Sequence, residues 1–503
     1  MKRFNNIHVV LVLAVLFASV PGCSKLDDFD DTNVDPTRVT VAATRAMLTN
    51  AIQHSIPVAA FGNSSGPAAT TNTRSNGVAN MYVQYLSEGP YPGGSLYNGL
   101  RFEYDTWYTG PLYNLQSIIN YNADPEKMAV EADPINNGSH NNQIAVARII
   151  KAFTYWHMTD RWGPIPYTEA LKGAGNYTPA YTPQDVIYKD LFKELKEATA
   201  QIDNGEPPAG DIFLNGDLDA WKRFANTQRL IMALRLSKVD ANLGKTEFAA
   251  ALAAGVITSN NENFLYHYVG GDPNNYNPWY NNYTVTNRND FAISETMVDY
   301  MKPLNDPRLE VYGEVLGARG VVGLEYGSDD ATNIPAAFSR IGSYFRGDNS
   351  PAAIFTYAQV LLSMAEAAHL SWIPGGEVSA KKYYEDAIKA SWEQYGVFDA
   401  VQFAAFISNP AVAYTPASSI EKILTQKWVH LYLNGSEAWA EWRRTGYPVL
   451  TPAPDYQSSQ NAIPRRQAYP VSDATNNKAN YDAAVTSLGG PDNLYTRIWW
   501  DKP

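Results

Sequence analysis

The sequence predicts a fold dominated by α-helices, in which helical hairpins carry a large, irregular, loop-rich region. Three observations predict it. Apolar residues recur at helical spacing in several long segments, convincing alternating strand patterns are few, and long tracts rich in Gly, Asn and Pro separate the helical segments. The 503 residues contain one cysteine, so an intramolecular disulfide is not expected and the fold depends on packing.

The amino-terminal segment predicts a secretory signal peptide over residues 1–22. Lys2 and Arg3 supply a short positive end, the apolar stretch Ile7–Val20 is shorter than a membrane-spanning helix, and a Pro-Gly turn precedes Cys23. A lone cysteine at the cleavage point is similar to the lipobox of bacterial lipoproteins, which implies that the mature chain begins at Cys23 and is acylated there. A plain signal peptide cut nearby is the alternative.

The mature chain is predicted to begin with an acidic tether over residues 23–37, followed by one domain over residues 38–503. Ser24 and Lys25 precede a run of aspartates that ends at Asp31, which resembles the export signal of surface lipoproteins in the Bacteroidota. A solvated linker is the simpler alternative for this acidic run. The body is large enough for an ample core, although chains beyond about 300 residues usually split into domains or extend by repetition.

Composition narrows the class of partner. The formal net charge is −12 at pH 7. A nucleic-acid partner would require clustered Lys and Arg, so none is expected, and an anionic membrane surface would be met only through the anchor. The chain also has 33 Tyr and 12 Trp, many of them in polar segments. Because tyrosine outside a core favours a ligand, a partner or a half-wet packing site, these rings indicate a binding function.

The first two strong helical stripes lie in the first half of the chain. One lies within residues 183–203, and Thr182 and Pro183 at its start predict an N-cap and a proline in the first helical position. The second lies within residues 217–240. We expect these two segments to pair as a hairpin.

Two more stripes follow in the second half. The third is expected over residues 351–371, opened by Ser350-Pro351, and its partner over 378–396 contains AKKYYEDAIKASWEQYG, which is similar to the second helix of a tetratricopeptide repeat. The fourth follows Thr415-Pro416 and is expected to stop at Asn434-Gly435, a pair suited to a left-handed cap. Since no strict repeat period links the pairs, the sequence predicts helical hairpins rather than a regular solenoid.

Long irregular tracts separate these helices. Loops of such length in a compact domain are usually functional or disordered, and their aromatic content favours function. They cover residues 57–79, 87–106, 122–142, 265–292, 317–350 and 446–495.

Motifs for catalysis or metal binding are weak. Gly62–Gly66 fits G-x-S-x-G, but Pro67 and a polar run follow where that motif needs a helix. The seven histidines include no pair at i,i+4, so no familiar zinc site is predicted. Asp31–Asp35 begins like a calcium loop, yet Pro36 replaces the glycine that the loop requires. We therefore predict no catalytic residue, no metal and no cofactor.

Five strings in fixed order carry a family resemblance. They are TDRWGPIPYTEAL (159–171), NDFAISETMVDYMKPLNDPRL (289–309), ILTQKWVHLYLNGSEAWAEWRRTGYPVL (423–450), IPRRQAYP (463–470) and NLYTRIWWD (493–501). Together they resemble the SusD/RagB family of surface nutrient-binding lipoproteins, in particular its SusD-like branch that ends in Trp-Trp-Asp. The resemblance runs from Cys23 to Asp501.

The resemblance implies both a fold and a function. The fold would be SusD-like, with four tetratricopeptide-like hairpins and a loop-rich half that carries the ligand site. The protein would be a non-enzymatic lipoprotein on the outer face of the outer membrane, with a SusC-like TonB-dependent transporter as its partner. Most members of the family bind oligosaccharides and some bind peptides. Two other readings stay open. A surface glycoside hydrolase would show two carboxylates about 5–9.5 Å apart across an aromatic cleft, and a protein-binding scaffold would show an apolar groove along the hairpins.

The family strings themselves are expected to be structural. Their tryptophans lie at helical or chain-end spacing, which favours core packing, and their arginines are expected to cap helix ends or to pair with acids. These residues are Trp428, Trp439, Trp442, Trp499, Trp500, Arg443, Arg444, Arg465 and Arg466.

The ligand site is expected in loops where aromatic rings lie among Asn and Gly, because a sugar ring offers an apolar face and a rim of hydroxyls. The main segment is 270–288, the second is 88–108 and the third is 339–350. A loop packed on its own domain is the alternative in each case, and a peptide ligand would use the same loops. Trp107 and Tyr108 are expected in the core. The candidate contacts are Tyr276, Trp279, Tyr280, Tyr283, Tyr91, Tyr97, Tyr344 and Arg346.

Overall fold

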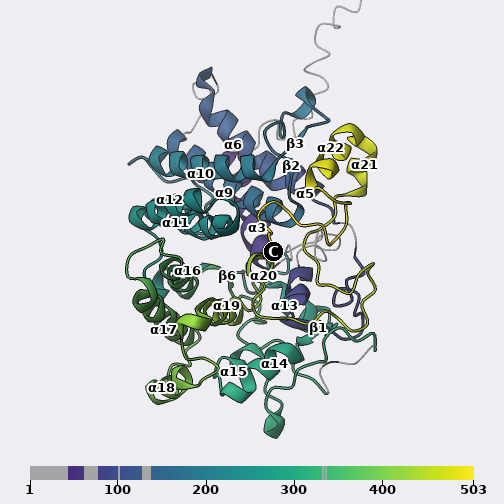
Figure 1. Ribbon diagram of the computed structural model, residues 1–503. Coiled ribbons are helices and arrows are strands. Elements are labelled where there is room, and N and C mark those ends of the chain that lie inside the picture. The colour runs from purple at the N-terminus through teal and green to yellow at the C-terminus, as the bar shows by residue number, and fades with distance from the viewer. Residues whose placement is uncertain (1–42, 62–76, 100–101, 127–136, 331–333, 335–336) are drawn as a thin grey trace, which may run out of the picture. The chain divides into compact units, whose positions relative to one another are not determined.

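Helices make up most of the chain in the computed structural model, and the predicted helix-dominated fold is confirmed (Figure 1). The structure describes residues 43–61, 77–99, 102–126, 137–330, 334 and 337–503. The part from Thr44 to Pro503 forms one compact unit. Within it, no described helix has the length and apolar character needed to cross a membrane. The predictions for Cys23, the acidic tether, the calcium-like loop and Gly62–Gly66 lie outside the described residues.

The first group of helices packs in chain order. Helix α6 packs against α9, α9 against α10, α10 against α11 and α11 against α12, while α3 covers α6 and α9. Most of α9 is buried because neighbours surround it. The bounds are α3 (Thr44–Phe61), α6 (Tyr113–Ala123), α9 (His140–Trp162), α10 (Gln184–Gln201), α11 (Leu218–Arg235) and α12 (Ala241–Ala254).

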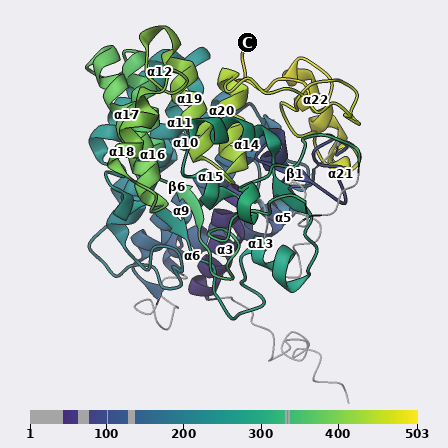
Figure 2. The same ribbon diagram turned by 90° about the horizontal axis from the view of Figure 1, so that it is seen from below.

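The second group is built around one hairpin. Helix α16 packs along α17 and also contacts α19 and α11, so it joins the two groups. Figures 1 and 2 show α10 to α12 and α16 to α18 on one side of this unit, with β1, α5, α21 and α22 on the other. The bounds are α16 (Tyr357–His369), α17 (Gly376–Gln394), α18 (Ala400–Ser408), α19 (Ser419–His430) and α20 (Gly435–Thr445).

The predicted pairing of 183–203 with 217–240 is only partly right. Helices α10 and α11 do touch, but α10 packs more extensively on α9, and α11 packs more extensively on α12. The short 3₁₀ turn η3 (Leu236–Lys238) returns the chain directly from α11 into α12. The apolar stripe in the sequence predicted α11, but it did not predict that α12 is the helix on which α11 packs most extensively.

Two predicted helix starts are wrong by a few residues. Helix α10 begins at Gln184 with Pro183 as its N-cap, one residue later than expected. Ser350-Pro351 does not open a helix, because the next residues form strand β6 (Ala352–Phe355), which pairs with β4 (Phe264–Tyr266). Helix α16 then starts after Thr356, whose hydroxyl accepts a hydrogen bond from the Gln359 N–H at 3.3 Å.

The turn between α19 and α20 also differs from the expected cap. Leu433 adopts the left-handed conformation, with φ of 67°, and Asn434 is the N-cap of α20. Gly435 is the first residue of α20, where a Cβ atom would lie 2.5 Å from the backbone nitrogen of Asn80. The glycine is therefore needed for a close approach and not for a left-handed turn.

Short antiparallel strand pairs tie the irregular half together. Strand β1 (Leu86–Glu88) pairs with β5 (Phe291–Ile293), and β2 (Ile165–Pro166) pairs with β3 (Tyr181–Thr182). The tracts predicted to be irregular contain short helices, namely α13 (Pro278–Tyr280), η5 (Asn281–Val285), η7 (Gly317–Arg319), α21 (Val471–Asn476) and α22 (Lys478–Leu488), and α5 (Asp105–Trp107) begins at the end of one tract. Further short helices lie outside these tracts. They are η1 (Tyr108–Leu112), η2 (Gly173–Gly175), η4 (Asn260–Glu262), α14 (Glu295–Met301), η6 (Lys302–Leu304), α15 (Leu309–Tyr312) and η8 (Pro416–Ser418).

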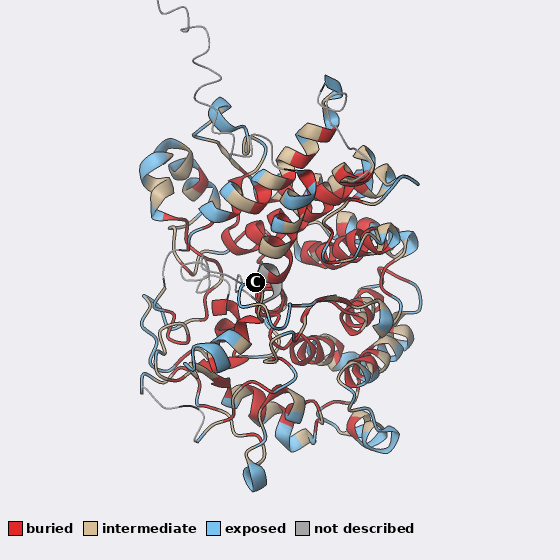
Figure 3. Ribbon diagram, turned by 180° about the vertical axis from the view of Figure 1, so that it is seen from behind, coloured by how far each residue is buried: buried red, intermediate tan, exposed pale blue. Residues whose placement is uncertain are grey.

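The core follows the facing sides of the helices, whereas exposed residues lie at outer turns and loop tips (Figure 3). The predicted packing of the family tryptophans is confirmed for Trp428, Trp439, Trp442 and Trp500, which are buried, and Trp499 is half-buried. The indole N–H of Trp500 donates to Asp160 at 2.8 Å. The chain end is thus fixed to the end of α9.

A buried ionic network crosses this core. Glu441 accepts from Lys427 at 3.1 Å and from Arg444 at 2.7 Å, and Arg444 also binds Glu366 at 2.6 Å. Arg235 adds contacts to Glu441 and to two further carboxylates. Burial lowers the pKa of Lys427 to about 7. Because buried charges are costly unless they are paired, the network explains how Lys427 of the fourth stripe can be buried.

Candidate functional site

The first two predicted binding segments lie side by side. The β1–β5 pair brings them together, and beyond it the Gly89 N–H donates to the Asp290 carbonyl at 2.9 Å. Arg288 then covers the ring of Tyr91, with its guanidinium carbon 5.5 Å from the ring centroid. The same arginine binds Asp290 at 2.7 Å. Residues from two distant parts of the chain therefore form one surface.

The third predicted segment is joined to the same surface by hydrogen bonds of the buried residue Asn277. Its backbone N–H donates to the Asp348 carbonyl and its side-chain amide donates to the Ser350 carbonyl, both at 2.9 Å. Its side-chain oxygen accepts from the Trp279 N–H at 2.8 Å and so starts α13. We call residues 88–98, 270–290 and 339–350 the loop cluster.

Four of the predicted rings can be reached from solvent. Tyr91 is 66% exposed, Tyr344 is exposed, and Tyr276 and Tyr280 are half-buried. The last two rings meet edge to face with centroids 5.0 Å apart. An aromatic ring that keeps one face free while its edge is held by a neighbour can lie against the apolar face of a ligand.

Three predicted rings are buried and support the loops instead. Trp279 packs edge to face on Phe291 at 5.5 Å, and the hydroxyl of Tyr283 donates to the Phe291 carbonyl at 2.8 Å. The hydroxyl of Tyr97 accepts from the Ala453 N–H at 3.1 Å. None of these three described rings offers a face to solvent, so we leave them out of the proposed contact set.

Arg346 is also engaged within the protein. It donates to the Ile341 carbonyl at 2.7 Å and to Glu314 at 3.1 Å. Arg340 binds the same carboxylate at 2.8 Å and holds the pKa of Glu314 below its usual range. Burial and the nearby charge of Arg340 lower the pKa of Arg346. Arg346 therefore braces the segment that carries Tyr344.

The expectation that Trp107 and Tyr108 belong to the core is confirmed. Trp107 is buried, and Tyr108 is half-buried with its hydroxyl donating to the Pro166 carbonyl at 2.5 Å. Burial raises the pKa of Tyr108 well above its ordinary value. Both rings pack on aromatic residues of α9, Trp107 on Trp162 and Tyr108 on Tyr155.

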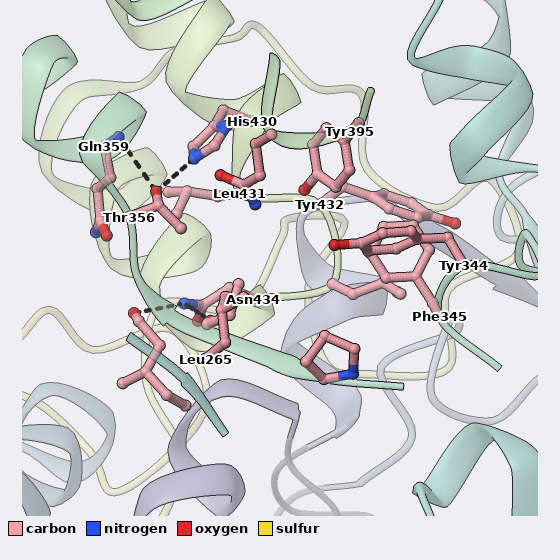
Figure 4. A pocket seen from close by; sticks show the side chains of 15 residues that line it. Leu265, Tyr344, Phe345, Thr356, Gln359, Tyr395, His430, Leu431, Tyr432 and Asn434 are labelled. Atoms are coloured by element: carbon pink, nitrogen blue, oxygen red, sulfur yellow. Dashed lines mark hydrogen bonds between the residues drawn. The ribbon is translucent and has the colours of Figure 1, made fainter. Parts of the chain in front are cut away.

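A pocket opens beside Tyr344 (Figure 4). It measures about 490 Å³ when counted out to open solvent, and its inner end is narrow. Phe345, Tyr395 and Tyr432 form aromatic walls, and Thr356, Gln359, His430 and Asn434 contribute polar groups. Nothing in the sequence pattern marked it, because it forms only where β6, the start of α16 and the α19–α20 turn meet.

Among the described residues, no group of three or more His, Cys, Asp or Glu side chains is placed to hold a metal ion. The two deeply buried histidines are accounted for by packing and hydrogen bonds. Burial lowers the pKa of His157 and of His430 to about 3, so both rings are neutral at ordinary pH.

The family model described as "Starch-binding associating with outer membrane", of the SusD-like type, matches residues 36–470. The chain belongs to this family. The resemblance drawn from the five sequence strings is therefore confirmed. No protein with a curated description matches the chain.

Solved structures with the same fold cover almost the whole of this SusD-like protein. A chitin-binding protein is 28% identical, with a TM-score of 0.74 over 92% of this chain and 100% of that chain. A chitin-binding SusD homolog from Flavobacterium johnsoniae is 26% identical, with a TM-score of 0.73 over 91% and 98%. A SusD homolog from Bacteroides uniformis is 24% identical, with a TM-score of 0.75 over 92% and 100%, and this likeness shows the fold alone.

Proposed function

We propose that this SusD-like protein captures an oligosaccharide at the loop cluster without making or breaking a covalent bond. The observation that carries the proposal is the set of reachable tyrosine rings held on loops that hydrogen bonds join into one surface. Tyr91, Tyr276, Tyr280 and Tyr344 supply ring faces, and Arg288 and Asp290 supply polar groups beside them. This combination suits a sugar, which is apolar on its faces and polar at its rim.

The sequence and the family support a place for this binding event. Cys23 would carry the lipid anchor on the outer face of the outer membrane, and a SusC-like TonB-dependent transporter would receive the ligand. The family description places its members at the outer membrane. Anchoring would keep the protein near its transporter, which raises the effective concentration of captured ligand there.

Two glycan classes are the first to test. Relatives that are 28% and 26% identical are described as chitin-binding, and the family is described as starch-binding. Chitohexaose and maltohexaose therefore serve as probes, together with a set of peptides for the peptide-binding alternative. Hydrolysis of either hexaose would favour the glycoside hydrolase reading instead.

The test uses the mature chain that starts after Cys23 in isothermal titration calorimetry. The double variant Tyr276→Ala/Tyr280→Ala removes two ring faces, and each truncation should cost about 1–2 kcal/mol of binding, as for an aromatic anchor. The matched control is Tyr177→Ala, because Tyr177 is also an exposed ring but lies outside the loop cluster. Unchanged hexaose binding in the double variant would overturn the site. Peptide binding alone, or release of shorter sugars, would overturn the function.

A further inference from the structure

Two residues that line the pocket beside Tyr344 each have a buried side-chain oxygen that lacks a hydrogen-bond partner among the described residues. The two atoms are the side-chain oxygens of Gln359 and Asn434, and these residues are only 1% and 8% exposed. Both side chains line the pocket. A buried acceptor without a partner is unfavourable in a folded protein, so a donor from outside the chain is the expected solution.

The orientation of both amides is fixed by their nitrogens. The Gln359 amide nitrogen donates to Glu437 at 3.3 Å, and the Asn434 amide nitrogen donates to the Ala353 carbonyl at 3.3 Å. Since both of these partners are acceptors, neither amide can be reversed without placing oxygen against oxygen. The two free atoms are therefore acceptors, and their missing partner must be a donor.

Thr356, His430 and Gln394, which also line the pocket, have hydrogen-bond partners within the protein. Thr356 Oγ1 and His430 Nε2 are 2.6 Å apart, and His430 Nδ1 lies 2.9 Å from Ser391 Oγ. Burial keeps this imidazole neutral by lowering the pKa of His430. None of the described residues that line the pocket is an Asp, Glu, Lys or Arg. A charged ligand group would lack a counter-charge here, so the fitting group is neutral.

The walls restrict the shape of that group. Leu265, Pro351 and Ile354 line the pocket together with the aromatic residues Phe345, Tyr395 and Tyr432. A short side group of a ligand, with an apolar carbon and a hydrogen-bond donor at its end, fits such a space. We call such a group an arm. A whole sugar ring would remain at the mouth of the pocket, against Tyr344. The exposed ring of Tyr344 thus belongs both to the loop cluster and to the pocket.

We propose that this pocket receives a neutral hydroxyl-bearing arm of the captured ligand, such as the hydroxymethyl group of a hexose, which donates to Gln359 Oε1 or Asn434 Oδ1. The inference rests on the proposed function and adds to it a preference for sugars that carry this arm. A pentose without the arm would leave both acceptors unpaired and would bind less well.

The first experiment compares methyl β-glucoside with methyl β-xyloside, two sugars that differ by the hydroxymethyl group. Their dissociation constants for the mature chain are measured by ligand-observed NMR. We expect the glucoside to bind about three- to tenfold more tightly, the usual effect of one hydrogen bond. Crystals soaked in the glucoside should show a sugar oxygen within hydrogen-bonding distance of Gln359 Oε1 or Asn434 Oδ1. Equal or undetectable binding of both sugars, or water alone at these oxygens, would overturn the proposal.

Two variants test the pocket by independent routes. Ala353→Phe fills the pocket from strand β6, and the double variant Gln359→Met/Asn434→Leu removes both acceptors at similar size. Either variant should bring the glucoside-to-xyloside ratio close to one, whereas the control Ala404→Phe, at an exposed position on α18, should leave it unchanged. A merely structural effect of the variants would weaken both sugars equally and leave the ratio as in the wild type, which would overturn the proposal.

The outcomes separate this inference from the proposed function. If the Tyr276→Ala/Tyr280→Ala variant loses hexaose binding while Gln359→Met/Asn434→Leu leaves the sugar ratio intact, the loop cluster stands and the pocket assignment fails. If no hexaose binds but the glucoside oxygen occupies the inner end, the proposed function fails and the pocket stands as a small-polyol site. If the small molecule asparagine amide, added as a probe, binds in the pocket and the glucoside does not, the pocket would be assigned to a peptide side chain and the hydroxyl assignment would be overturned.

Discussion

Arg235 and Arg288 show how differently two regions of this molecule use the same side chain. Arg235 is 0% exposed in the helical core and contacts three carboxylates. Arg288 is 55% exposed in the loop cluster, where its one ion pair within the described part of the chain is with Asp290 and where it covers the ring of Tyr91. In the core, the buried positive charge pairs with buried carboxylates, out of contact with water. In the loop cluster, charge and ring faces remain available to solvent. The residues that mark the family and the residues proposed to bind ligand are therefore largely separate sets.

The largest effect is expected when the buried arginine, Arg235, is replaced. Arg235→Met leaves three buried carboxylates with too little positive charge, and breaking a buried ion pair costs about 3–5 kcal/mol. Arg288→Met removes an exposed pair and should cost less than about 1 kcal/mol. Urea unfolding followed by circular dichroism measures both. Equal losses of unfolding free energy in the two variants would show that burial does not distinguish the two arginines.

Adjacent aromatic residues allow the same comparison within the loop cluster. Trp279→Ala removes a buried ring that packs on Phe291 and should lower the free energy of unfolding by about 3–5 kcal/mol. Tyr280→Ala removes a half-buried ring and should cost less than about 1 kcal/mol of stability, while weakening hexaose binding about 5- to 30-fold. Unfolding curves and calorimetric titration give the two quantities for each variant. A stable Trp279→Ala variant with lost binding would reverse the assignment of these rings.

The stability of the protein should depend on pH through Lys427, the lysine of the buried ionic network. Burial lowers the pKa of Lys427 to about 7 in the folded protein, whereas the unfolded value is about 10.4. Between these values the unfolded chain binds a proton that the folded chain does not, so the contribution of Lys427 to stability rises with pH. The slope is at most about 1.4 kcal/mol per pH unit.

The check is the difference in unfolding free energy between the wild type and Lys427→Met, measured from pH 7 to pH 9. As the pH rises, the unfolding free energy of the wild type should increase relative to that of the variant, because the variant has no titrating group at this position. Using the difference removes the contributions of tyrosines and other groups that titrate in both proteins. Two pH profiles that run parallel would contradict the lowered pKa.

The sequence predicted the helical core better than the loops, for a physical reason. Apolar residues at helical spacing identify α10 and α11 directly, because burial on one face repeats every three to four residues. The start of α16 was misplaced because Ser350-Pro351 resembles a helix opening, while the pairing of β6 with β4 depends on residues almost ninety positions away. Helix boundaries next to such long-range pairs cannot be obtained from local pattern alone.

Composition also predicted the three segments of the loop cluster as candidates for binding, but it did not predict which rings within them are buried and which are exposed. Trp279 and Tyr280 are neighbours in one short helix, and only the turn started by Asn277 decides which ring faces Phe291. Loops lack the periodicity that separates inner from outer positions in a helix. The free acceptors of Gln359 and Asn434 had no sequence signal at all, since amide side chains are common at both buried and exposed positions.

The smallest expected effect concerns Tyr91, the most exposed of the candidate rings. Tyr91→Ala should change the free energy of unfolding by less than about 0.5 kcal/mol, because the ring is 66% exposed and the side chain of Arg288 that covers it is itself 55% exposed. Hexaose binding should weaken only a few-fold, since three other reachable rings remain. Calorimetric titration beside Tyr177→Ala measures this difference. A loss of stability as large as that of Trp279→Ala would mean that Tyr91 supports the loops, and the ligand surface would then be confined to the side of the cluster that carries Tyr276, Tyr280 and Tyr344.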